Sequence, residues 1–226
     1  MKSLAEAREL AQTMVEIGKS LNRKTLAVVT DMNQPLGHEV GNANEVREAI
    51  EVLKGRGAED LTVVSLVIAP YMSVLGGAYS DFNAAFIELK SLIESGKAIE
   101  KLKQLVKNQG GNPDIIDHPD RLPQAKYHVE VKSSETGYVT AINAESIGVS
   151  AMLLGAGRKQ KDDIIDHSAG LTIVKKIGDK VITGDTICLL HTNIEEHAEA
   201  EIMVRSAFSF GDTKPAPISY VYEVIQ

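Results

Sequence analysis

The first part of the chain repeats apolar residues at helical spacing. Ser3 and Glu6 have the spacing of a capping box at a helix start, and an apolar stripe follows at Ala7, Leu10, Met14, Ile17 and Leu21. The next run, TLAVVTDM, is short, apolar and rich in β-branched residues, which predicts a buried strand. Such a strand needs neighbours, and the sequence before it supplies none.

Further helices are predicted up to about residue 112. Asn42 and Glu45 offer a second helix cap after a turn-rich loop. The run EDLTVVSLVIAPYMSVLGG is apolar almost all round, which predicts a core helix that Pro70 bends or breaks. Two more stripes predict helices that end at Gly96 and at the segment NQGGNP.

The second half alternates as strands do. YHVEV and GYVTAI have a period of two, and GLTIVKKIGDKVITGDTICLLHT reads as two or three strands with Gly-Asp turns. AESIGVSAMLLGAG and NIEEHAEAEIMVRSAF predict helices, and ISYVYEVI a final strand. The predicted fold class is therefore α/β plus α+β, with a domain boundary in the turn-rich segment GGNPDIIDHPDRLPQ.

Composition narrows the function classes. The 226 residues carry a net charge of −7, which argues against a nucleic-acid or anionic-membrane surface. No apolar run has the length of a membrane span, and no signal peptide precedes the first predicted helix. A single cysteine, Cys188, leaves no disulfide framework, so we expect a cytoplasmic protein.

The loop TDMNQPLGHEVGNANEVREAI, Thr30 to Ile50, is the first candidate site. Turn carbonyls beside an acidic side chain such as Glu48 suit a hard cation, monovalent or divalent. A solvated helix glutamate next to an ordinary turn explains the same residues, and from the residues alone it is the commoner case.

The segment LLGAGRKQKDDIID is the second candidate. Its glycines and the basic residues that follow suit a phosphate contact or a mobile lid, although a glycine-rich helix end before a solvated loop is more common. The run VKKIGDKVITGDTICLL has the turn spacing of biotinyl and lipoyl carrier domains without the sequence context of a modifiable lysine. The six histidines show no zinc-binding spacing.

Several long motifs resemble the pyrimidine-nucleoside phosphorylases, the thymidine phosphorylase family. They are VVTDMNQPLGHEVGNANEVREAIEVLKGRG, LVKNQGG, AMLLGAGR and DHSAGLTIVKKIGDKV, in matching order and spacing from end to end. The resemblance implies that this chain corresponds only to the later part of a longer protein. Residues 1–112 would be the C-terminal part of a large α/β domain with helices on a mixed sheet. Residues 113–226 would be the family's C-terminal α+β domain, with a mainly antiparallel sheet.

The resemblance also implies an activity and partners. The family converts a pyrimidine nucleoside and phosphate, the co-substrate, to the free base and a pentose 1-phosphate, as a homodimer. Its KxSTGG-type phosphate loop and the Arg, Ser and Lys that grip the base are absent here. We therefore expect a missing N-terminal half, and an isolated chain that is inactive. A non-catalytic binding or assembly module derived from the family is the alternative; an exposed apolar face on helix 3–21 or strand 25–31 would count against it.

The family's site residues carry over at few positions. Related enzymes hold a potassium ion beside the phosphate loop, and the matching ligands are the carbonyls of Leu36 and Glu39 and the side chain of Glu48. The remaining ligands would come from the missing half. Gly155, Gly157 and Arg158 match a segment that orders over the closed cleft, so we expect a lid without a catalytic role.

Overall fold

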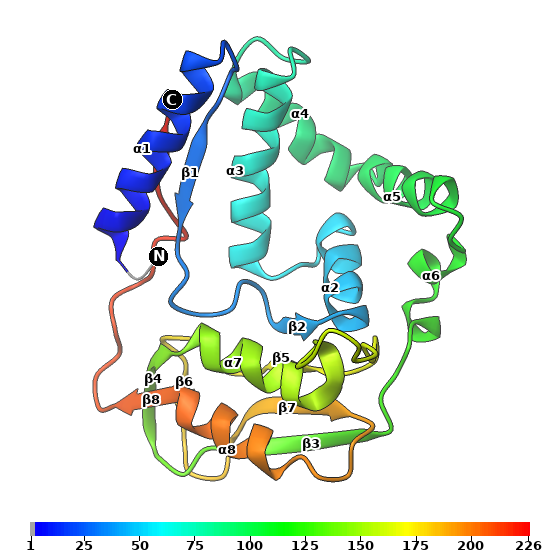
Figure 1. Ribbon diagram of the computed structural model, residues 1–226, viewed down its shortest axis with the longest axis vertical. Coiled ribbons are helices and arrows are strands. Elements are labelled where there is room, and N and C mark those ends of the chain that lie inside the picture. The colour runs from blue at the N-terminus through cyan, green and yellow to red at the C-terminus, as the bar shows by residue number, and fades with distance from the viewer. Residues whose placement is uncertain (1–2) are drawn as a thin grey trace. The chain divides into compact units, whose positions relative to one another are not determined.

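The computed structural model describes residues 3–226, and the chain forms two compact units built from segments distant in sequence (Figure 1). The first unit comprises the segment that ends at Asp31, residues 59–98 and residues 218–226. The second comprises residues 32–58 and 99–217. The division at residue 112 follows the order of the sequence, whereas these units interleave its segments, and the division stays a prediction.

The first unit begins with helix α1 (Leu4–Ser20), whose predicted cap is confirmed. The Ser3 hydroxyl oxygen accepts a hydrogen bond from the Glu6 backbone N–H at 3.2 Å. Strand β1 (Ala27–Thr30) pairs antiparallel with β9 (Val221–Ile225), and Ala27 lies opposite Ile225. The neighbour that β1 needs therefore comes from the other end of the sequence.

Helices α3 (Glu59–Leu75) and α4 (Phe82–Glu94) complete this unit, with the start of α5 (Lys97–Asn108). Helix α3 continues through Pro70 and buries Val64 and Pro70, but Met72 is 66% exposed. The prediction of a core helix is therefore wrong within the described residues, because α4 is the main neighbour of α3 and covers one side of it.

The second unit contains two antiparallel sheets, whose strand orders are β2-β5-β7-β3 and β6-β4-β8. Its strands are β2 (Glu39–Gly41), β3 (Tyr127–Lys132), β4 (Gly137–Ile142), β5 (Gly170–Ile173), β6 (Lys180–Val181), β7 (Thr186–Thr192) and β8 (Phe208–Gly211). Its helical segments are α2 (Ala43–Leu53), most of α5, α6 (Asp114–Asp117), η1 (Pro119–Arg121), α7 (Ala144–Ala151), the π-helical turn η2 (Met152–Ala156) and α8 (Ala198–Ala207).

The main core of the second unit lies between its strands and helices α7 and α8, which pack against each other (Figure 1). Val131, Ile147, Leu171, Ile187 and Leu190 are fully buried there. Each such side chain contributes roughly 1.5–3 kcal/mol through removal from water. Buried residues of the strands, together with those of α7 and α8, thus supply the core that the period-two pattern predicts.

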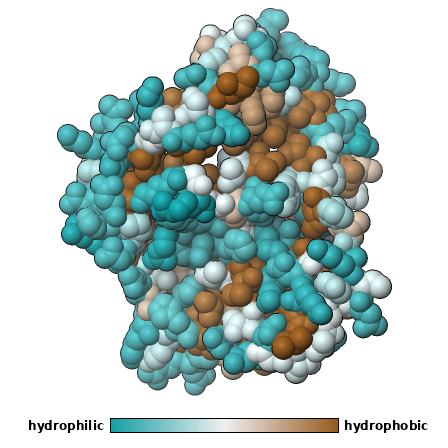
Figure 2. All heavy atoms as spheres, turned by 180° about the vertical axis from the view of Figure 1, so that it is seen from behind, coloured by the Kyte–Doolittle hydropathy of each residue, from teal (hydrophilic) through white to brown (hydrophobic). Residues whose placement is uncertain are grey.

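The predicted combination of helices with mainly antiparallel sheets is confirmed. Every strand pair within residues 3–226 is antiparallel, so the parallel pairing that a mixed sheet would add is not found in this part of the chain. No helix of the described residues is both long and apolar enough to cross a membrane. Apolar residues do interrupt the hydrophilic surface in several places (Figure 2).

Candidate cation-binding loop

The loop before α2 wraps around the carboxylate of Glu48. One carboxylate oxygen accepts a hydrogen bond from the His38 backbone N–H at 2.6 Å, and the other from that of Glu39 at 3.3 Å. Gly37 has a φ of +70°, and a Cβ at this position would lie 2.4 Å from a Glu48 oxygen. Glycine is needed here both for its backbone conformation and for the close approach of the carboxylate.

The surroundings of Glu48 favour a nearby positive charge. Partial burial raises the pKa of Glu48 above its ordinary value, and the negative charge of Glu39 adds to this effect. The hydrogen bonds from His38 and Glu39 act in the opposite direction and lower the pKa. A cation beside the carboxylate would offset the cost of burying its charge.

The predicted potassium ligands fit such an ion in part. The Glu39 side chain turns away from Glu48 and accepts hydrogen bonds from the Thr172 hydroxyl at 2.7 Å and the Asn44 amide at 3.0 Å. The Glu39 side chain is therefore engaged elsewhere, and its role as a backbone ligand stays a prediction. No three His, Cys, Asp or Glu side chains gather into a metal-binding group within residues 3–226. An ion at this loop would depend on backbone carbonyls such as that of Leu36, and three ligands leave its oxygen shell incomplete.

The predicted cap of α2 differs from the observed one. The Asn42 side chain makes no capping hydrogen bond; it donates instead to the Ala156 carbonyl at 2.9 Å. Glu45 does act at the helix start, where its carboxylate accepts from the Gly41 backbone N–H at 2.8 Å. The Asn42 amide is redirected because the turn after α7 offers a half-buried carbonyl within reach.

The predicted lid begins beside the Ala156 carbonyl that Asn42 contacts. Gly155 has a φ of +108° at the end of the π-helical turn, and its carbonyl accepts from the Asp166 backbone N–H at 2.9 Å. At the far end, the Ala43 backbone N–H donates to the His167 carbonyl at 3.0 Å. The structure therefore joins both ends of segment 156–167 to the start of α2.

The middle of this segment is held by its own contacts. Asp163 accepts hydrogen bonds from the backbone N–H groups of Lys159 and Gln160, at 3.0 and 2.9 Å. Gly157 marks the exit from the helical turn, and the Arg158 side chain is exposed. Two glycines at one hinge and an exposed basic residue are consistent with a hinged segment.

A cavity that sequence reasoning missed lies in the second unit. It has a volume of about 370 Å³, and its lining includes Asn44, Arg47, Asp120, Ser168, His128 and His191. The two histidines face each other across the β3–β7 pair, with 2.8 Å between their Nδ1 atoms. His191 Nε2 lies 2.8 Å from the Thr172 hydroxyl, which donates to Glu39.

These contacts determine which ring nitrogens carry a hydrogen when His128 and His191 are both neutral. Because Thr172 donates to the Glu39 carboxylate, its oxygen accepts from Nε2–H of His191, and His191 Nδ1 accepts from His128. Burial lowers the pKa of His191 below its ordinary value. The sequence holds no local signal for the pair, since 63 positions separate the two histidines and only the strand register joins them.

Comparison with known proteins agrees with the motifs. Residues 138–210, which run from β4 into β8, match the family model described as the pyrimidine nucleoside phosphorylase C-terminal domain. This part of the chain is thus similar to that C-terminal domain. Pyrimidine-nucleoside phosphorylases from Staphylococcus aureus strains RF122 and USA300 are each 43% identical to the chain over 225 residues. The match covers 100% of this chain and 52% of each relative.

The chain is therefore homologous, over its whole length, to the C-terminal portion of the pyrimidine-nucleoside phosphorylases, as the sequence motifs indicated. It spans about half the length of the curated relatives that it matches.

Proposed function

We propose that this chain supplies the C-terminal portion of a pyrimidine-nucleoside phosphorylase, which converts a pyrimidine nucleoside and phosphate to the free base and a pentose 1-phosphate. The end-to-end similarity supports the family, and one structural observation supports the role of the loop. The Glu48 carboxylate, which the resemblance assigns to the family's ion loop, is closed in by Gly37 and bound by the backbone of His38 and Glu39.

A potassium ion would be held by the carbonyls of Leu36 and Glu39 and by the Glu48 side chain, with its other ligands from a segment outside residues 1–226. Such an ion would supply a fixed positive charge beside the bound phosphate. The chain's own contribution is to hold the carboxylate in place before any ion binds, because two backbone N–H groups already orient it.

The segment that contains Gly155, Gly157 and Arg158 would close over the substrate cleft. Its hydrogen bonds to Asn42 and Ala43 support this role. A movement of the segment would strain or break these bonds at the start of the helix that carries Glu48. The segment would exclude water and would take no part in the chemical step.

The isolated chain is expected to be inactive, because groups that bind phosphate and base would come from elsewhere. The exposed apolar face of α1 supports a covering segment: Leu10, Met14, Ile17 and Leu21 are between 45% and 67% exposed. An uncovered apolar stripe of this kind marks an interaction surface. It argues against the alternative of a self-sufficient binding module, and assembly into a homodimer is part of the same proposal.

The test is phosphate-dependent release of uracil and thymine from their nucleosides. The purified chain is assayed alone and mixed with the N-terminal half of the Staphylococcus aureus relative, with that full-length relative as positive control. We expect no turnover alone and turnover in the mixture. Glu48→Gln in the mixture should lower the rate, whereas Glu51→Gln, on the same helix and paired with Arg56, should not.

Turnover by the chain alone would contradict the expected inactivity. A folded mixture that associates and yet releases no base, beside a working control, would contradict the proposed reaction.

A further inference from the structure

The side chain of Lys176, which follows strand β5, reaches the same loop. Its Nζ donates hydrogen bonds to the carbonyl oxygens of Pro35 and Gly37, at 2.5 and 2.6 Å. These carbonyls flank Leu36, the residue whose carbonyl is the candidate ion ligand. The half-buried ammonium thus places a positive charge against the very loop that is expected to hold a cation.

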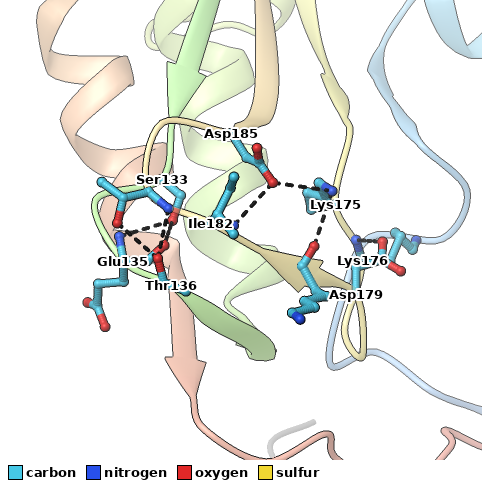
Figure 3. A network of polar contacts seen from close by, with 10 residues as sticks. Ser133, Glu135, Thr136, Lys175, Lys176, Asp179, Ile182 and Asp185 are labelled. Atoms are coloured by element: carbon cyan, nitrogen blue, oxygen red, sulfur yellow. Dashed lines mark hydrogen bonds and ion pairs between the residues drawn. The ribbon is translucent and has the colours of Figure 1, made fainter.

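The backbone around Lys176 holds the ammonium in position. The Lys176 N–H donates to the Asp179 carboxylate at 2.8 Å, in the first of the two predicted Gly-Asp turns (Figure 3). The next residue, Ile177, donates its N–H to the side-chain carbonyl of Gln34 at 3.0 Å. Lys176 is therefore delivered by a turn that is itself hydrogen-bonded to the loop.

A second attachment lies three residues earlier, at the end of strand β5. The Ile173 N–H donates to the His38 carbonyl at 2.7 Å, and His38 Nδ1 lies 2.7 Å from the Ile173 carbonyl. His38 is also one of the two residues whose N–H groups bind Glu48. The contacts run from Lys176 through the loop carbonyls to the backbone that orients the carboxylate.

An ammonium group and a potassium ion carry the same charge, and both are stabilised by converging oxygen atoms. Two nearby carbonyls that point toward one place repel each other unless a donor or a cation lies between them. Charge-assisted hydrogen bonds of this length are among the stronger ones in proteins. Lys176 can hence do for the Pro35 and Gly37 carbonyls what a bound monovalent cation would do.

We propose that Lys176 is a positioning residue whose ammonium acts as a built-in monovalent cation. It holds residues 34–38 in the shape that presents the His38 and Glu39 N–H groups to Glu48, so the loop is formed before any dissolved ion binds. This inference rests on the proposed function, because that proposal gives the loop its role in ion binding. Its test reads the loop itself and needs no turnover.

The neighbouring lysine provides a matched control. Lys175 lies 3.7 Å from the Asp185 carboxylate and donates to the Lys180 carbonyl at 3.2 Å, within the same hairpin (Figure 3). It makes no hydrogen bond to residues 34–38 among the contacts of the described chain. Lys175→Met and Lys176→Met therefore remove the same charge from adjacent positions, and Lys176→Met alone removes it from the loop.

The experiment measures amide hydrogen exchange of His38 and Glu39 by NMR in the full chain. Lys176→Met removes both charge-assisted hydrogen bonds to the loop, so it should speed exchange at both amides on the order of tenfold or more. Lys175→Met should leave both rates unchanged. In Lys176→Ala, propylammonium should restore slow exchange, and tetramethylammonium, which has no N–H donor, should not.

Unchanged rates in Lys176→Met would overturn the proposal, and so would equal acceleration in Lys175→Met. Rescue by tetramethylammonium would show that the effect is general ionic screening, and this result would also overturn the proposal. If the Lys176 variants do not fold, the ammonium hydrogens of Lys176 are observed in the unaltered chain. Slow exchange of these hydrogens supports the proposal, and free exchange contradicts it. Failure of the phosphorolysis assay with success here would refute the proposed reaction alone.

Discussion

Replacing Gly37 by alanine tests how tightly the loop encloses Glu48. The left-handed backbone at φ +70° costs a non-glycine residue about 1–2 kcal/mol. The new Cβ would lie 2.4 Å from one Glu48 oxygen and 2.7 Å from the other, so the carboxylate must move. Movement would sacrifice a charge-assisted hydrogen bond to His38 or Glu39, at a cost of about 1.5–3 kcal/mol. We expect a total destabilisation of about 2.5–5 kcal/mol.

Gly110→Ala is the matched control in the same unit. Gly110 has a φ of +79°, and an added Cβ would meet nothing within 4 Å, so only the backbone cost of about 1–2 kcal/mol applies. The free energy of unfolding is measured by urea titration, followed through the methyl NMR signals of Ile50 and Leu171. Both side chains are fully buried in the second unit, so its unfolding is observed separately from that of the first unit.

The difference between the two variants isolates the collision with Glu48. Equal destabilisation by Gly37→Ala and Gly110→Ala would refute the argument that the carboxylate fills the space beside Gly37. A double variant, Gly37→Ala with Glu48→Ala, offers a second test. Because the collision disappears with the carboxylate, the double variant should cost less than the sum of the two single changes.

Three further outcomes follow from the second unit. Burial raises the pKa of the Cys188 thiol to about 12, so iodoacetamide should label the native chain far more slowly than the urea-unfolded chain, and equal rates would contradict this. The lowered pKa of His191 means that the unfolded chain binds this proton more readily. Stability should therefore fall as the pH drops below about 6.5, and His191→Gln should reduce the slope of urea midpoints between about pH 8 and pH 5. Leu171→Ala should cost about 2–5 kcal/mol of unfolding free energy, against less than about 0.5 for Ile202→Ala at a 68% exposed position; similar losses would contradict the assigned core.

Local patterns in the sequence were sufficient to predict most of the helices, strands and turns. The helix cap at Ser3 and the Gly-Asp turns at Asp179 and Asp185 are formed by contacts three residues apart, as the sequence indicates. The family motifs also identified the loop around Glu48. These features can be predicted from sequence because helix caps, tight turns and glycine requirements depend on residues close together in the chain.

The exposure of α3 shows where local reasoning failed. Its residues are apolar on nearly every side, which predicts burial, yet Met72 and Val63 are exposed in the described chain. The hydrophobic pattern of a helix or strand indicates which residues it can bury. It does not state which other segments are available to cover it.

The sequence alone determined the elements, the turn chemistry and the resemblance that identifies the loop. Only the tertiary structure decided that β9 pairs with β1, that His128 meets His191, and that Lys176 reaches the carbonyls of Pro35 and Gly37. The Lys176 contacts join residues about 140 positions apart. They depend on strand register and chain topology, and a single sequence carries no short-range pattern that reports either.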